Sequence, residues 1–206
     1  MSNKIVKDTL AITLITLISG LALGLVQDIT AGPIAKQQKK AKEEAYKAVF
    51  ADADTFEELT LTEELSAAIE ANLDENGYTA QNIDEIMLAK DNAGAEIGYA
   101  FTVTSSEGYG GDIQFAMGVK ADGTMNGISI LNISETAGLG MKATTAEFQE
   151  QFKEKKVEKF SYTKSGASAD NEIDALSGAT ITTNAMTNGV NAGLCTFQFA
   201  KGGNLE

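Results

Sequence analysis

The chain has 206 residues, with 16 lysines, no arginine, no histidine and a formal net charge of −13. Imidazole bases, histidine metal ligands and bidentate guanidinium clamps are therefore excluded, and the acidic balance argues against nucleic acid as a partner. The single cysteine, Cys195, cannot form an internal disulfide or hold an iron–sulfur cluster, so it is interpreted as a small buried side chain. Any electron chemistry in this chain requires a cofactor.

The first predicted element is an uncharged apolar segment over residues 9–26. At ~1.5 Å per residue it spans about 27 Å, close to the ~30 Å hydrocarbon core of a bilayer. We expect a transmembrane helix here, with residues 1–8 as a short tip and the lipid bilayer as a partner. A cleaved signal peptide is the alternative, but its apolar part is normally only about 7–15 residues long and residues 29–31 make a poor cleavage site.

A stalk helix is predicted over residues 27–50, because Ile34, Ala41, Ala45 and Val49 fall along one side of a helical pattern. Two lysines precede the apolar segment and four follow it within residues 36–42. Counted alone, these charges favour a cytoplasmic location for the C-terminal part.

Residues 51–206 are expected to form one domain. It begins with a helix over residues 60–73, which starts at a capping box of Thr60 and Glu63. A second, short amphipathic helix over residues 145–155 carries Phe148 and Phe152.

Between these helices, alternating apolar residues and tight turns predict two hairpins, whose strands must be antiparallel. The turn at Asp122 and Gly123 is a strong hairpin signal. The fold class is therefore predicted as α+β, an antiparallel sheet or sheets with flanking helices, preceded by one N-terminal transmembrane helix. The four expected strands cover residues 83–89, 96–104, 112–120 and 124–133.

A last helix is predicted to start at Thr182 or Thr183, because Met186, Val190, Leu194 and Phe197 form one apolar stripe. A second stripe consists of small residues, which would let this helix approach a sheet closely. It contains Ala185, Gly189 and Gly193.

The segment before this helix has the spacing of a phosphate site. Gly178 and Ala179 are small enough to let backbone amides approach an anion, which the helix start would stabilise. A polar loop with a threonine N-cap is the alternative. The complete pattern, in which Asp174, Ser177, Gly178, Ala179, Thr180 and Thr182 occupy the fixed positions, resembles the attachment motif of the FMN-binding domain family. Within that family it is most similar to the G subunit of Rnf electron-transport complexes, and then to the C subunit of the sodium-pumping NADH:quinone oxidoreductase.

Two loops strengthen the resemblance. Residues 108–111 match a GYGG segment of the family, and residues 135–140 match its ETPGLG segment with Ala137 in place of the usual proline. The resemblance implies a flavin pocket, and Tyr109 could contact the flavin ring. The alternative is that both loops serve only the fold. The pocket residues expected from these loops are Tyr109, Glu135, Thr136, Gly138, Leu139, Gly140 and Lys142.

The resemblance implies a covalent FMN esterified to Thr182, attached by a flavin transferase, in a domain on the extracytoplasmic side of the cell membrane. It further implies electron relay within a multi-subunit complex that couples ferredoxin and NAD redox chemistry to Na⁺ or H⁺ translocation. No catalytic residue, no structural metal and no nucleic-acid partner is expected, and a GxGxxG nucleotide fingerprint is absent from the sequence. The alternatives are an anchored module that binds flavin or a phosphate ligand without electron relay, and a purely structural anchored protein. Substitution of Gly140 is expected to leave attachment intact and to affect electron transfer only.

Overall fold

The computed structural model describes residues 3–204, and the chain divides into two compact units between Ala41 and Lys42. Helix α1 (Asn3–Val49) supplies the whole of the first unit that is described. Its large apolar side chains from Ile5 to Ile34 are exposed. By length and composition this helix could cross a membrane, a test that a signal sequence at this position also passes.

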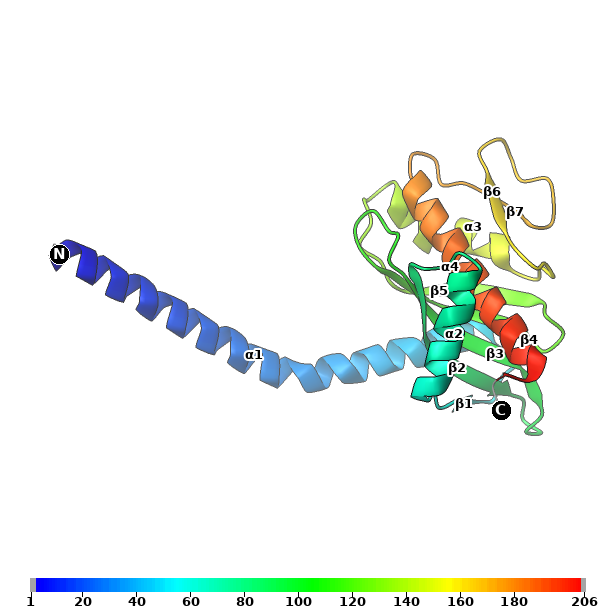
Figure 1. The fold of residues 1–206 in the computed structure, drawn as a ribbon, viewed down its shortest axis with the longest axis horizontal. Coiled ribbons are helices and arrows are strands. Elements are labelled where there is room, and N and C mark those ends of the chain that lie inside the picture. The colour runs from blue at the N-terminus through cyan, green and yellow to red at the C-terminus, as the bar shows by residue number, and fades with distance from the viewer. Residues whose placement is uncertain (1–2, 205–206) are drawn as a thin grey trace. The chain divides into compact units, whose positions relative to one another are not determined.

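The second unit is built around a five-stranded antiparallel sheet, whose strands follow one another in sequence order (Figure 1). Both predicted hairpins are confirmed, and Asp122 and Gly123 form the turn of the second one. The fold-class prediction, α+β with an antiparallel sheet and flanking helices, is also confirmed. The strands are β1 (Thr55–Glu58), β2 (Gln81–Lys90), β3 (Glu96–Ser105), β4 (Ile113–Lys120) and β5 (Met125–Asn132).

One face of the sheet carries large apolar side chains and is covered by helices α2 (Glu63–Glu75) and α4 (Thr180–Phe199). The small-residue stripe of α4 has the predicted role. An added Cβ at Gly189 would lie 2.9 Å from the ring of Phe115, and one at Gly193 would collide with the sulfur of Met117. Close helix–sheet packing therefore depends on these two glycines.

The other face of the sheet carries alanines, on which the last turns of α1 pack. Tyr46 and Lys42 donate hydrogen bonds to Glu85 Oε2 at 2.5 and 2.9 Å. Burial opposes ionisation of Glu85, but these two hydrogen bonds outweigh it and keep the pKa of its carboxyl below the usual range. The predicted stalk over residues 27–50 thus includes a last part that belongs to the folded unit.

The sequence prediction misplaced two helices. The capping box at Thr60 and Glu63 is wrong, because Thr62 is the N-cap of α2 and accepts a hydrogen bond from the Leu65 amide at 3.2 Å. The predicted helix over residues 145–155 ends early, because the Lys155 carbonyl accepts a hydrogen bond from the amide of Met125 at 2.7 Å. It is replaced by η1 (Gly140–Thr144), α3 (Ala146–Gln149) and η2 (Glu150–Phe152).

The sequence prediction also missed three short strands. One is β1, and the others are β6 (Ser161–Thr163) and β7 (Glu172–Asp174), which form a separate two-stranded sheet. This second sheet is parallel, although only antiparallel pairing was expected. Three or four residues are too few for an alternating pattern to stand out in the sequence.

Candidate functional site

The start of α4 is open to a ligand. The helix begins at Thr180, two or three residues before the predicted start, and its N-cap residue, Ala179, makes no side-chain capping bond. The first intrahelical bond runs from the Thr183 amide to the Ala179 carbonyl at 2.9 Å. Among the described residues, the amides of Thr180, Ile181 and Thr182 have no hydrogen-bond acceptor. Such amides, together with the helix dipole, stabilise an anion.

The turn that leads into α4 is fixed by its own residues. Gly178 has φ +75°, a conformation that favours glycine. The hydroxyl of Thr183 is buried, accepts a hydrogen bond from the Leu176 amide at 3.0 Å and donates one to the Ala179 carbonyl at 2.9 Å. Thr183 therefore holds the turn, and its hydroxyl is already occupied.

The hydroxyl of Thr182 has a different hydrogen-bond partner from that of Thr183. Thr182 is 1% exposed, and its Oγ1 donates a hydrogen bond to Glu135 Oε2 at 3.0 Å. Glu135 itself is buried and comes from the loop after β5. Two motifs separated by 47 positions thus meet at one hydroxyl and one carboxylate.

The GYGG loop, residues 108–111, also contacts Glu135. The Gly110 amide donates a hydrogen bond to Glu135 Oε1 at 3.2 Å. A Cβ at Gly108 would lie 2.9 Å from Glu135 Oε1, and one at Gly110 would collide with the Ser134 carbonyl. The two loops therefore contact one another through backbone that tolerates no side chain at these positions.

Gly140 is equally restricted. A Cβ there would collide with Thr182 Oγ1 and would lie 2.6 Å from Glu135 Oε2. Contrary to the sequence-based prediction, we now expect a substitution of Gly140 to impair attachment at Thr182, since the added side chain must displace the very hydroxyl that is to be esterified.

These loops and the start of α4 enclose a cavity of about 490 Å³, within the range of small-molecule sites. Of the residues described beyond position 41, only three large apolar side chains are exposed, and all three line it: Tyr109, Leu139 and Ile181. No lysine lines the cavity, and Glu135 is its one acidic residue. Its full lining is Tyr109, Glu135, Thr136, Leu139, Gly140, Gly178, Ala179, Thr180, Ile181 and Thr182.

Four predicted residues do not line this cavity. Asp174 lies on β7, and its Oδ1 accepts a hydrogen bond from the Ala167 amide at 2.7 Å, so it orders a neighbouring loop. Ser177 is exposed in the turn before α4. Gly138, with φ +77°, shapes the turn of its loop. Lys142 lies on η1, beyond the lining residues.

Sequence reasoning missed Ile181, which occupies a free position of the attachment motif. The sequence contains no signal for it, because a single apolar side chain is common on a protein surface.

The composition of the cavity fits FMN. A hydroxyl adjoins three acceptor-free amides for a phosphate, and glycine and apolar side chains adjoin them for a planar ring. The residues suited to the phosphate end are Thr180, Ile181 and Thr182, and those suited to the ring are Tyr109, Leu139 and Gly140.

A match to the FMN-binding domain family covers residues 108–194, which include all ten lining residues of the cavity. The chain is 32% identical over 194 residues to the G subunit of the Na⁺-translocating ferredoxin:NAD⁺ oxidoreductase complex of Acetobacterium woodii, covering 92% of this chain and 89% of that protein. It belongs to the family of oxidoreductase-complex G subunits. It is also 31% identical over 189 residues to the G subunit of the proton-translocating ferredoxin:NAD⁺ oxidoreductase complex of Clostridium ljungdahlii, covering 91% of this chain and 89% of that one.

Among solved structures, the crystal structure of NqrC from Shewanella oneidensis is similar to this G-subunit family member with a TM-score of 0.48 and 20% sequence identity. The likeness covers 55% of this chain and 57% of that one.

Proposed function

We propose that this chain carries FMN covalently, through a phosphoester to Thr182, and relays electrons within a membrane complex. The observation that carries the proposal is the meeting of all three motif segments at the Glu135 carboxylate, which accepts the hydrogen bond of the Thr182 hydroxyl, in a cavity that otherwise offers backbone amides, glycine and exposed apolar side chains. When bound, FMN would supply one- and two-electron transfer, for which the chain has no side chains of its own.

Glu135 is the residue best placed to take the proton of the Thr182 hydroxyl when the ester forms. Its Oε2 already accepts that hydrogen bond at 3.0 Å, which is within reach for a general base. A flavin transferase would deliver the flavin from FAD: the new bond joins Thr182 Oγ1 to the FMN phosphorus, the pyrophosphate bond breaks and AMP leaves. Once the ester has formed, Glu135 no longer accepts a hydrogen bond from that hydroxyl and would lie beside a phosphodiester.

The exposed apolar side chains define the surface for electron exchange in this proposal. Tyr109, Leu139 and Ile181 are 71%, 41% and 52% exposed, in a domain whose other described large apolar side chains are covered. An electron carrier must come close to the flavin ring, and apolar contact favours such an encounter. The loop from Glu135 to Lys142 would lie next to that carrier.

The proposal places the domain outside the membrane. Residues 9–26 would span the bilayer, residues 1–8 would lie in the cytoplasm, and the stalk would begin at residue 27 and lead into the extracytoplasmic domain. A long folded domain can be translocated despite flanking lysines, although the lysine count by itself favours the opposite orientation. Protease added to spheroplasts is expected to remove the flavin domain, and protection until lysis would contradict this orientation.

The complex would be of the type named for the two G-subunit relatives, coupling ferredoxin and NAD redox chemistry to ion translocation. The names of those relatives specify Na⁺ in one case and protons in the other, so the proposal extends to either ion. The remaining proteins of that complex and the flavin transferase are the proposed partners.

Co-expression with a flavin transferase tests the proposal. The full chain should gain the mass of FMN minus water and remain yellow after denaturation and precipitation. Thr182→Ala should abolish the adduct, whereas Thr182→Ser should retain it. Thr183→Ser is the matched control, because it preserves the two buried hydrogen bonds of that hydroxyl, which Thr183→Ala would remove. Yellow colour that washes away on denaturation would instead indicate a reversible flavin-binding module.

A further inference from the structure

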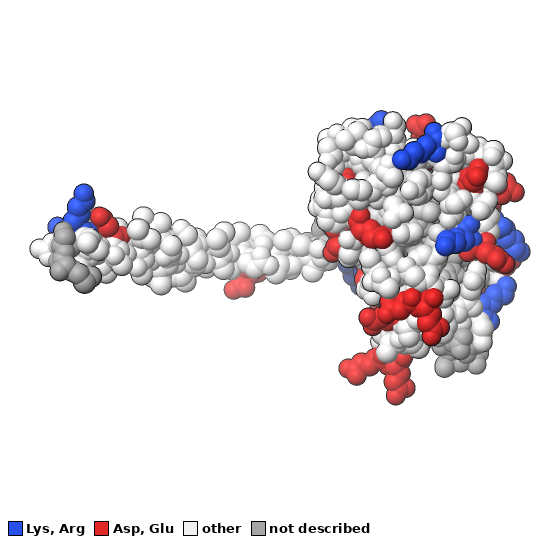
Figure 2. All heavy atoms as spheres, turned by 45° about the horizontal axis from the view of Figure 1, so that its top comes forward, with Lys and Arg blue, Asp and Glu red and all other residues white. Residues whose placement is uncertain are grey.

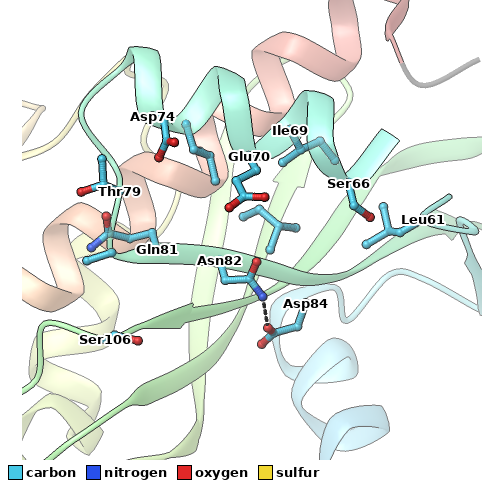
Figure 3. A pocket seen from close by; sticks show the side chains of 13 residues that line it. Leu61, Ser66, Ile69, Glu70, Asp74, Thr79, Gln81, Asn82, Asp84 and Ser106 are labelled. Atoms are coloured by element: carbon cyan, nitrogen blue, oxygen red, sulfur yellow. Dashed lines mark hydrogen bonds between the residues drawn. The ribbon is translucent and has the colours of Figure 1, made fainter. Parts of the chain in front are cut away.

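A second cavity of the folded unit lies outside the FMN-binding match, between helix α2 and the start of β2 (Figure 3). It has a volume of about 780 Å³. In Figure 3, Ser66, Ile69 and Glu70 point from the helix towards the strand that carries Asn82 and Asp84. We call this cavity the α2–β2 groove, and define it by Leu61, Ser66, Ile69, Glu70, Leu73, Asp74, Thr79, Ala80, Gln81, Asn82, Ile83, Asp84 and Ser106.

The strand side of the groove is an open sheet edge. Strand β1 pairs with β2 only from Met87 to Lys90, and the Leu59 amide adds one bond to the Ile86 carbonyl. Among the described residues, Gln81 to Glu85 therefore have a strand neighbour, β3, on one side only, although the Gln81 amide already donates a hydrogen bond to the Tyr78 carbonyl at 3.3 Å. The unpaired amides and carbonyls of such an edge are a template for another extended backbone.

The helix side of the groove has the right length for a strand. The lining positions on α2 run from Ser66 to Asp74, which is about 12 Å at ~1.5 Å per residue. An added strand of about four residues covers the same distance at ~3.3 Å each. Ile69 and Leu73 form an apolar floor beneath it.

The charge of the groove has one sign. Glu70, Asp74 and Asp84 line it, and no lysine does. Asp84 is already engaged, because it accepts hydrogen bonds from Asn82, Thr104 and Gln114. By contrast, the carboxylates of Glu70 and Asp74 make no hydrogen bond or ion pair with any residue that the structure describes.

Helix α2 adds to the negative charge around the groove, since it contains five acidic residues and no basic one. Figure 2 shows acidic side chains gathered in the lower part of the folded unit. A metal ion is a poor fit, because the described residues contain no group of three or more acidic, cysteine or histidine side chains that could hold one.

We propose that the α2–β2 groove binds an extended, basic segment of a partner protein, which adds to the open edge of β2. A lysine or arginine of this segment lies between Glu70 and Asp74. A second copy of this chain is a poor occupant, because its net charge of −13 would repel the groove. The proposal does not depend on flavin.

The test uses the full chain in neutral detergent and a fluorescent eight-residue peptide of alternating valine and lysine. This peptide is expected to bind in fluorescence anisotropy and to slow hydrogen exchange at the amides of residues 82–85. The double variant Glu70→Lys and Asp74→Lys should weaken binding at least tenfold. The matched control is Glu64→Lys with Glu75→Lys, which changes the charge of the same helix equally outside the groove and should retain most of the binding.

A second peptide separates strand addition from simple charge attraction. Proline in place of the two central valines keeps all lysines but removes backbone donors, and should weaken binding about as much as the groove variant. The proposal is overturned if the valine–lysine peptide fails to bind at millimolar concentration, if both double variants weaken it equally, or if the proline peptide binds as well. Self-association of the chain through residues 81–85 would also overturn it, in favour of a second copy.

Discussion

The cavity at the start of α4 and the α2–β2 groove are built by opposite means. The first is the smaller, about 490 Å³ against 780 Å³, and consists of loops and a helix start held together by Glu135. The second consists of ordinary helix and strand residues. An ester to a hydroxyl and close backbone approach to a ring demand particular residue types at fixed positions. A groove for an extended backbone demands only shape, an open edge and charge, so it leaves no motif.

This difference predicts that the cavity at the start of α4 tolerates few substitutions. Gly140→Ala should give the largest effect, because the added Cβ must displace Thr182 Oγ1 and Glu135. We expect little or no FMN adduct and a loss of about 1–3 kcal/mol in the free energy of unfolding, as for other overpacked sites. Intact mass and denaturant unfolding measure the two effects. Gly138→Ala is the control: its φ of +77° makes alanine strained and should lower stability, but a Cβ there meets nothing within 4 Å, so the adduct should be retained.

Removal of the Glu135 carboxylate should have the second largest effect on FMN attachment. Glu135→Gln preserves an acceptor for the Gly110 amide but is far less basic, so attachment is expected to slow by about 100-fold, as for loss of a general base. The measurement is the rate of adduct formation with purified transferase and FAD. An unchanged rate would show that the transferase supplies the base and that Glu135 only orients Thr182.

Removal of the Lys142 charge should have only a small effect on the flavin potential, although this residue closely follows the segment 135–140. Because Lys142 does not line the cavity, its contribution is that of an exposed charge, ~0.2–1 kcal/mol. For a two-electron couple this corresponds to a fall of about 5–20 mV in the flavin potential for Lys142→Ala. Spectroelectrochemical titration of the labelled chain measures the shift, and a much larger fall would place the ammonium beside the ring.

Substitutions in the α2–β2 groove should have the smallest effect on FMN attachment. The double variant Glu70→Lys and Asp74→Lys should form the FMN adduct at the wild-type rate, because no residue of the groove lines the other cavity. A slower rate would show that the two regions are coupled through α4, which packs against α2. The same transferase assay measures it.

Sequence reasoning succeeded where the pattern was long or chemically restricted. The stripe of α4 and both hairpins were predicted, as were nine of the ten residues that line the first cavity. It failed where tertiary contacts decide. The helix after Thr145 ends because Lys155 pairs with Met125, and among the described strands β6 and β7 pair only with one another. The motif also could not tell that Asp174 orders a loop while Glu135 holds Thr182.

The most direct test of the account is the position of the flavin on the chain. After labelling by the transferase, protease digestion and tandem mass spectrometry of the yellow peptide locate the modified residue. The account predicts FMN on Thr182, the hydroxyl bonded to Glu135 and in contact with the cavity. An adduct on Thr180 or Thr183, or a peptide that carries none, would contradict it.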